Sequence, residues 1–476
     1  MLKLIIANIY TTIFFFSAGI FLNHQIFKKQ KINNLYTHGI YGGILLCFLG
    51  LALNFIIALD QNINTLILIF FTIYFAIHLY KYDYLKIYIK KIFFVSLVSI
   101  ILITLANSNR PDAGLYHLPF IQILNEEKLI VGLANIHFRF GTNSIIQYLS
   151  ALNFNYFFGI AAITVPLSVL VSFLILYFFQ EFLIENKNNK QSFKLLFLFF
   201  ILIFILYSFN RYSNFGNDAT ASITFLLLIY IFLFQFDFKK IEINILLKLY
   251  ILSVFLFTQK LFYIVALLLI FLIYIFDKDK KKYFINPKIH LPTLFLLIFL
   301  IKNFLVSGCI LYPVKLTCLN VSWLDINTVS KEAISGNAWS KDWVNYKNVN
   351  SISKDEYIKN FIWIDTWLKN HAKIIFEKLL PLFILLIIFF IFNKGKRKKK
   401  FETINFNFII ALVLSLSGTI VWFLYFPIYR YGTGYIFSTI LLIYVLLFNN
   451  FFYVKKFTIS AMYYILILCF ILAGLK

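Results

Sequence analysis

Apolar runs of about 16–23 residues recur along almost the whole of this 476-residue chain. Hydrophobic residues make up 61% of the sequence and charged residues only 13%. A soluble domain cannot bury so many runs of that length, whereas a bilayer needs roughly 20 apolar residues for each helical span. The sequence therefore predicts an all-α polytopic membrane protein with about 14 (12–14) transmembrane helices. The predicted spans lie near 3–22, 37–59, 64–82, 91–107, 157–182, 192–209, 217–236, 243–258, 261–276, 290–307, 373–393, 405–426, 434–452 and 457–474.

The basic residues indicate how these spans are oriented. The formal net charge is +24, and lysine clusters lie at 28–31, 81–91, 278–282 and 394–400. These clusters fall in alternate connections between spans, and the positive-inside rule places such connections in the cytoplasm. We therefore assign the charge to orientation and to contact with anionic lipid, and we do not expect a nucleic-acid partner. The apolar segment 4–22 precedes its basic cluster and has no obvious cleavage site, so we expect a retained first span with the N-terminus outside.

The alternation of lysine-rich and lysine-poor connections divides the chain into transmembrane spans and two large external loops. The loops are a motif-rich segment with short interfacial helices and a Trp-rich cap. The predicted parts are the N-terminal transmembrane helices (1–106), the external motif loop (107–156), the central transmembrane helices (157–306), the external cap loop (307–372) and the C-terminal transmembrane helices (373–476).

Arginine is rare and unusually placed. The sequence has 39 lysines and five arginines, and four of the five arginines fall on the predicted outer side, where basic residues should be scarce. Arginine is retained where a planar, two-pronged donor must meet a carboxylate or phosphate. Local ion pairs, such as Arg211 with Asp218 or Arg110 with Asp112, are one explanation. A shared external cavity that receives an anion is the other. The four outer arginines are Arg110, Arg139, Arg211 and Arg430.

Asp112 is the candidate catalytic residue of the motif loop. Pro119 disfavours a helix that begins at 113, and a helix that begins near Leu118 with Pro119 in its first turn fits better. Asp112 would then lie in an irregular loop near the bilayer surface, where a carboxylate can act as a general base toward a hydroxyl. The alternatives are a helix cap or an ion-pair partner of Arg110 or Arg139.

Tyr116, His117 and His137 are candidate substrate-binding residues of the same loop. The two histidines flank the acidic pair Glu126 and Glu127, but their spacing matches no known metal-ligand pattern. We therefore assign no metal ligands and no certain cofactor, although a divalent cation remains possible.

The other external loops repeat the combination of charge and aromatic rings. Asp218 follows Arg211 at the mouth of one span, Arg430 lies among tyrosines in FPIYRYGTGY, and Lys260 separates two spans. Aromatic residues at a membrane surface often form the interfacial belt. Arginine beside aromatic rings also suits a sugar next to a phosphate, through stacking and charge-assisted hydrogen bonds.

The four cysteines fall into two kinds. Cys47 and Cys469 lie in apolar spans, where we expect them to be inert. Cys309 and Cys318 share the external cap loop, and their spacing permits a disulfide around the Tyr312–Pro313 turn on a non-cytoplasmic side.

An acidic residue in an early external loop, with basic and aromatic loops on the same face of many spans, resembles the GT-C superfamily of membrane glycosyltransferases. More narrowly, DAGLYHLP, GLANIHFRFG, FGND, SGCILYP and YRYGTGY look like an uncharacterised family of bacterial polytopic membrane proteins. The GT-C resemblance implies that Asp112 activates the acceptor hydroxyl. Here, however, the carboxylate is single and follows about four predicted spans, where GT-C enzymes commonly place it after one.

The resulting hypothesis is an enzyme at the outer face of the bacterial inner membrane, with its motif loops in the periplasm. It would move a sugar from a polyprenyl-phosphate-linked donor to a cell-envelope glycan or lipid acceptor. Asp112 would be the base, and Arg110, Arg139, Arg211, Lys260 and Arg430 would hold the phosphate. A transporter or flippase of an anionic lipid-linked saccharide, and an oligosaccharide polymerase or ligase, remain as alternatives.

Overall fold

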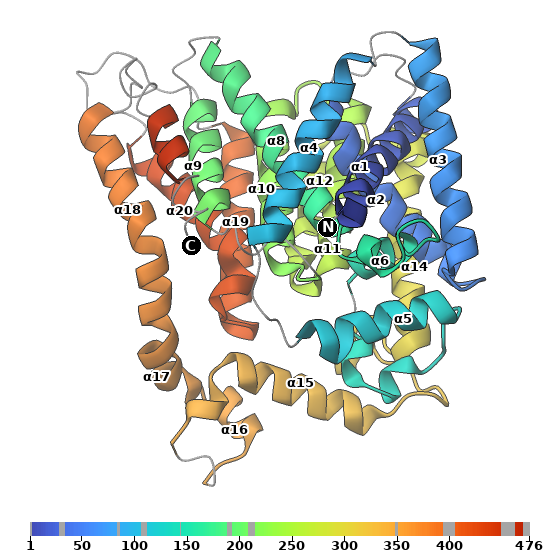
Figure 1. Ribbon diagram of the computed structural model, residues 1–476. Helices are drawn as coiled ribbons and strands as arrows, with labels where there is room; N and C mark the ends of the chain where they lie inside the picture. The colour runs from blue at the N-terminus through green and yellow to red at the C-terminus, as the bar shows by residue number, and fades with distance from the viewer. Residues whose placement is uncertain are drawn as a thin grey trace.

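In the computed structural model, the secondary-structure elements of the described residues are all helices (Figure 1). Within those ranges the only β-type contact is an isolated bridge between Cys309 and Cys318. The described residues are 2–27, 34–82, 86–105, 112–142, 144–187, 193–207, 215–347, 351–393, 405–448 and 462–469.

Within these described ranges, ten helices are long and apolar enough to cross a bilayer. The predicted class, an all-helical multi-pass membrane protein, is therefore confirmed. These helices are α1 (Leu2–Leu22, continued by a wide turn Asn23–Phe27), α2 (Leu35–Asn54), α3 (Gln61–Lys81), α4 (Lys86–Leu105), α8 (Pro166–Lys187, preceded by α7, Ile160–Ile163), α10 (Asp218–Gln235), α14 (Pro287–Ser307), α18 (Lys373–Asn393), α19 (Phe406–Tyr425) and α20 (Tyr429–Phe448).

Three of the other predicted spans form shorter apolar helices, and these stand among the long ones in Figure 1. The last predicted span, 457–474, lies largely outside the described residues. A count of 14 spans therefore stays a prediction. The three short helices are α9 (Phe193–Tyr207), α11 (Ile243–Gln259) and α12 (Val265–Phe276, preceded by a short turn Leu261–Ile264).

The two predicted external loops cover one end of the bundle. Helices α5 and α15 lie across the lower ends of the upright helices in Figure 1, and α16 and α17 lie beside them below α18. The end of α3 and the start of α4 lie at the opposite, upper end. The helices of the loops are α5 (Leu118–Glu126), α6 (Ile146–Leu152), α15 (Ile326–Ser340), α16 (Lys354–Lys359) and α17 (Trp363–Trp367), and the short α13 (Lys281–Ile285) precedes α14.

Helix α5 begins where Pro119 predicts, because the proline occupies its first turn and needs no backbone donor there. The preceding residues do not form the expected irregular loop. They form a wide helical turn, Ala113–His117, and Asp112 stands at its start without a side-chain capping bond. At the other end of α5, the Asn125 amide donates to the carbonyls of Leu59 and Ala151, at 2.6 and 3.0 Å. The motif loop is thus fastened to the bundle.

The cap loop is closed near its start by a disulfide and contacts the bundle farther along. A disulfide joins Cys309 and Cys318, directly after Gly308, the residue that caps the end of α14. Gly308 has a positive φ of 76°, and an added Cβ would lie 2.9 Å from the side chain of Leu324, so only glycine fits this helix end. Farther along, the indole of Trp367 donates to the Pro427 carbonyl at 2.7 Å. This contact docks the cap on the connection between α19 and α20.

Candidate functional site

Three charged side chains from distant parts of the chain meet at the end of the bundle that the loops cover. Asp218 begins α10, Lys260 connects α11 to the next helical turn, and Arg430 lies in the first turn of α20. The Lys260 ammonium forms an ion pair with Asp218 Oδ1, and Arg430 Nε lies 3.4 Å from Asp218 Oδ2. One carboxylate therefore holds two cations, and its place in the first turn of a helix also favours its negative charge.

Polar contacts between the helices bring these three residues together. The Asn217 amide donates to the Gln259 carbonyl at 3.1 Å, which joins the start of α10 to the end of α11. Ser222 on α10 lies 2.7 Å, hydroxyl to hydroxyl, from Thr433 on α20. A Cβ added to Gly434 would lie 3.0 Å from Ser222 Cα, so glycine permits the close approach of α20 to α10.

Tyr431 lies against both cations of this cluster. The Lys260 ammonium is 3.9 Å from the centroid of the Tyr431 ring, and the Arg430 guanidinium carbon is 5.1 Å from it. Arg430 also donates to the Tyr431 hydroxyl at 3.3 Å. These cation–π contacts hold the two positive groups side by side, although like charges repel each other.

The motif loop adds a second group of polar residues. The Arg139 guanidinium lies 5.0 Å from the Tyr116 ring, and the Tyr116 hydroxyl hydrogen-bonds to Asp112. Burial, with the nearby Asp112 carboxylate, raises the pKa of Tyr116 to about 12. Tyr116 therefore stays protonated at neutral pH and donates to Asp112, which leaves the other lone pairs of this carboxylate for a further donor.

His117 is held as a neutral ring. Burial lowers the pKa of His117 to about 4; Lys260 and Arg139 act in the same direction, and Asp112 opposes them. Gln147 accepts from the Ser144 backbone at 3.2 Å through its carbonyl, so its amide nitrogen faces His117 Nδ1 at 2.7 Å. That amide donates to Nδ1, and the ring proton is consequently on Nε2.

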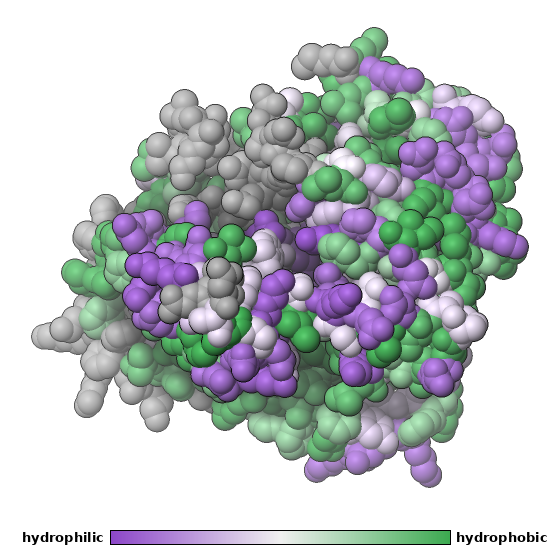
Figure 2. Space-filling view, turned by 90° about the horizontal axis from the view of Figure 1, so that it is seen from below, coloured by the Kyte–Doolittle hydropathy of each residue, from purple (hydrophilic) through white to green (hydrophobic). Residues whose placement is uncertain are grey.

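The two groups form one site. Asp112, Arg139 and Arg430 all lie close enough to Lys260 to act on its charge, and Tyr431 acts on Tyr116 in the same way. The His117 ring also stacks on Phe215, just before α10, with centroids 6.2 Å apart. Seen from below, the surface carries many hydrophilic side chains around a hollow near its middle (Figure 2). Three basic side chains, those of Arg139, Lys260 and Arg430, therefore lie together with the carboxyl groups of Asp112 and Asp218 in the described part of the site.

The remaining candidate site residues from the sequence differ from their predicted roles or lie outside the described residues. Arg110 and Arg211 lie outside the described residues. Asp218 pairs with Lys260 and Arg430. His137 accepts from the Arg139 backbone at 3.2 Å and caps the short turn Phe138–Phe140, so its ring serves the local backbone. Throughout the ranges that the structure describes, no three His, Cys, Asp or Glu side chains gather closely enough to hold a metal ion.

The sequence analysis missed two members of the site. Gln147, which fixes the His117 ring, lies in a buried helix of the motif loop, and its spacing from His117 carries no recognisable signal. Glu332 belongs to α15 in the cap loop, and it acts on Arg139 across nearly 200 positions of sequence. Only the docking of α15 beside the turn Phe138–Phe140 brings that carboxyl to the site.

Glu332 predicts a pH dependence of the cap. Burial raises the pKa of Glu332 to about 7 although Arg139 lowers it, so the folded cap holds a proton that the unfolded chain releases above about pH 4.5. The stability of the cap should therefore fall as the pH rises from about 4.5 to 7, and then level off. Thermal unfolding followed by tryptophan fluorescence should show this slope in the wild type and a smaller one in Glu332→Gln. Parallel pH profiles for the two proteins would contradict the assignment.

Fold and site together define a multi-pass, all-helical membrane protein with a cluster of basic and acidic side chains at one end of its bundle. The chain belongs to the family described as a domain of unknown function (DUF8201), whose sequence model matches residues 1–437. No curated protein and no solved structure matches the chain. The family match spans every residue of the site, from Asp112 to Tyr431.

Proposed function

We propose that this protein is a GT-C-like membrane glycosyltransferase that moves a sugar from a polyprenyl-phosphate-linked donor to a cell-envelope glycan or lipid. The observation that carries the proposal is the gathering of three basic side chains, Arg139, Lys260 and Arg430, beside the carboxylate of Asp112. A lipid-linked phosphate needs cations at the membrane surface, and a sugar acceptor needs a base next to them.

The proposed reaction assigns each group a role. The acceptor hydroxyl gives its proton to Asp112 while its oxygen attacks the anomeric carbon of the donor sugar. The bond from that carbon to the phosphate oxygen breaks, and the polyprenyl phosphate leaves with the electron pair. Lys260 and Arg430 stabilise the negative charge that develops on this phosphate. Tyr116 and Tyr431 supply aromatic faces for the sugar.

The proposal includes the finer topology. All 14 apolar segments cross the bacterial inner membrane, and the loops that contain Asp112 and the cap face the periplasm. The lysine-rich connections near 28, 280 and 397 support this orientation, since they would all lie in the cytoplasm. The Cys309–Cys318 disulfide agrees with an oxidising compartment for the cap loop.

A transporter or flippase of an anionic lipid-linked saccharide is the second candidate. A polar cavity at the opposite end of α10 and α11, lined by Tyr177, Gln235 and Lys248, favours it, because a carrier needs polar access from both faces.

Two measurements decide between these functions. Mass spectrometry of envelope glycans should show one sugar fewer in cells that lack the gene, together with accumulated polyprenyl-phosphate sugar. Purified protein in nanodiscs should then transfer radiolabelled sugar from that donor to the acceptor extracted from the deletion strain. If proteoliposomes only redistribute the lipid-linked saccharide between leaflets, with no new glycosidic bond, the transferase proposal fails and the transporter is supported.

A further inference from the structure

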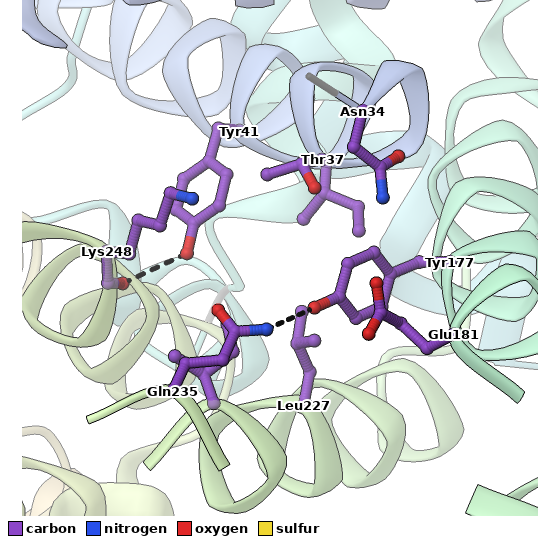
Figure 3. A pocket seen from close by; sticks show the side chains of 10 residues that line it. Asn34, Thr37, Tyr41, Tyr177, Glu181, Leu227, Gln235 and Lys248 are labelled. Atoms are coloured by element: carbon purple, nitrogen blue, oxygen red, sulfur yellow. Dashed lines mark hydrogen bonds between the residues drawn. The ribbon is translucent and has the colours of Figure 1, made fainter. Parts of the chain in front are cut away.

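A polar cavity of about 170 Å³ lies among α2, α8, α10 and α11, away from the candidate site (Figure 3). Gln235, the last residue of α10, lines it, whereas Asp218 at the start of α10 belongs to the candidate site. At 1.5 Å per residue, these two positions are roughly 25 Å apart along the helix. The cavity therefore belongs to the opposite membrane face and is a separate site.

Hydrogen-bonding groups face this cavity from three sides (Figure 3). Gln235 donates through its amide nitrogen to the Tyr177 hydroxyl at 3.0 Å. This contact leaves the Gln235 carbonyl as an acceptor and the Tyr177 hydroxyl proton as a donor. The Thr37 hydroxyl lies across the cavity on α2 and can donate or accept a hydrogen bond.

Charged groups stand on two walls of the cavity. Glu181 accepts from the Tyr230 hydroxyl at 2.7 Å and pairs with Lys194 at 3.5 Å, and both contacts fall on Oε2. Neither of these contacts uses the other carboxylate oxygen, Oε1. Lys248 supplies a cation on the far wall, where its backbone carbonyl accepts from the Tyr41 hydroxyl at 3.2 Å.

We propose that this cavity binds a hydroxyl-rich solute of monosaccharide size, either a neutral hexose or a hexose phosphate. The wall offers both donors and acceptors, which suits hydroxyl groups because each of them both donates and accepts. The Tyr177 ring offers an aromatic face. The volume is below the roughly 300–1,000 Å³ of pockets for drug-sized ligands, yet it exceeds that of several waters at roughly 30 Å³ each.

Lys248 should make the cavity bind a hexose phosphate in preference to a neutral hexose. A phosphate would face the Lys248 ammonium, and the sugar hydroxyls would face Glu181, Gln235 and Tyr177. A neutral hexose would make only the contacts with Glu181, Gln235 and Tyr177. The inference stands independently of the proposed transferase activity, since no residue is shared between the two sites.

Binding of radiolabelled glucose and glucose 1-phosphate to the full-length protein in nanodiscs tests the proposal. Saturable binding of at least one of the two is expected, and glucose 1-phosphate should bind more tightly if Lys248 receives its phosphate. Thr37→Val and Gln235→Leu should each weaken binding about 3- to 10-fold, the range for loss of a single hydrogen bond. Ser253→Ala, a buried change elsewhere on α11, should leave binding unchanged.

Separate outcomes would overturn the inference. If neither probe binds, the cavity holds water only. If both probes bind but Thr37→Val and Gln235→Leu bind as the wild type does, the sugar occupies another place. Loss of binding in Asp112→Asn, with both cavity variants unaffected, would assign it to the candidate site. The isosteric Thr37→Val variant keeps the test valid if Gln235→Leu does not fold.

Discussion

Replacing Asp112 with asparagine should abolish sugar transfer while the protein folds and inserts as the wild type does. Asparagine has nearly the same shape and can still accept the hydrogen bond from Tyr116, but it cannot take a proton from an acceptor hydroxyl. Loss of a general base typically slows a reaction about 10²- to 10⁴-fold. Asp112 makes no side-chain capping bond in the turn that it begins, so the substitution removes no cap from that turn.

The measurement is the initial rate of sugar transfer by purified protein, together with its thermal unfolding midpoint. Glu126→Gln is the matched control: it removes a carboxylate from the same loop, on an exposed side chain that accepts from the Gln122 amide at 2.8 Å. The control should keep the wild-type rate. An Asp112→Asn protein that is stable and fully active would remove Asp112 from the mechanism.

Replacing Asp218 with alanine should lower both stability and activity. Lys260 and Arg430 would lose their shared counter-ion in a site where the side chain of Lys260 is only 17% exposed. Removing one partner from a buried ion pair costs about 3–5 kcal/mol, and the partial exposure of Arg430 favours the lower end. The two cations would also repel each other, so the arrangement proposed to hold a phosphate would be disturbed.

Denaturation of Asp218→Ala in detergent measures the stability effect, and the double variant Asp218→Ala with Lys260→Met identifies its cause. If uncompensated charge is responsible, removing the lysine should restore part of the lost stability without restoring transfer. Asp365→Ala breaks an exposed ion pair with Lys369, which should change stability by less than about 1 kcal/mol. Equal losses in Asp218→Ala and Asp365→Ala would contradict the assignment of Asp218 as a buried counter-ion.

Tertiary structure corrected or extended the sequence analysis at particular residues. The sequence offered Arg211 as one local partner of Asp218, and Arg211 lies outside the described residues. Within the described residues, α10 and α20 pack so that Asp218 meets Arg430, which is far away in the sequence. The sequence also paired Cys309 with Cys318, a contact close enough along the chain to be read locally. Glu332 and Gln147 gave no such signal, since their partners lie in other elements.

The sequence by itself determined the class of this protein. Long apolar runs require a bilayer, and a proline such as Pro119 sets a helix start through its own ring. Both effects act within one helix length, so they can be read directly from the order of residues. The meeting of Asp112, Lys260 and Arg430, and the cavity at the opposite face, were decided only by tertiary structure. The physical reason is that helix packing and the pairing of distant charges depend on which faces meet, and no local pattern records this.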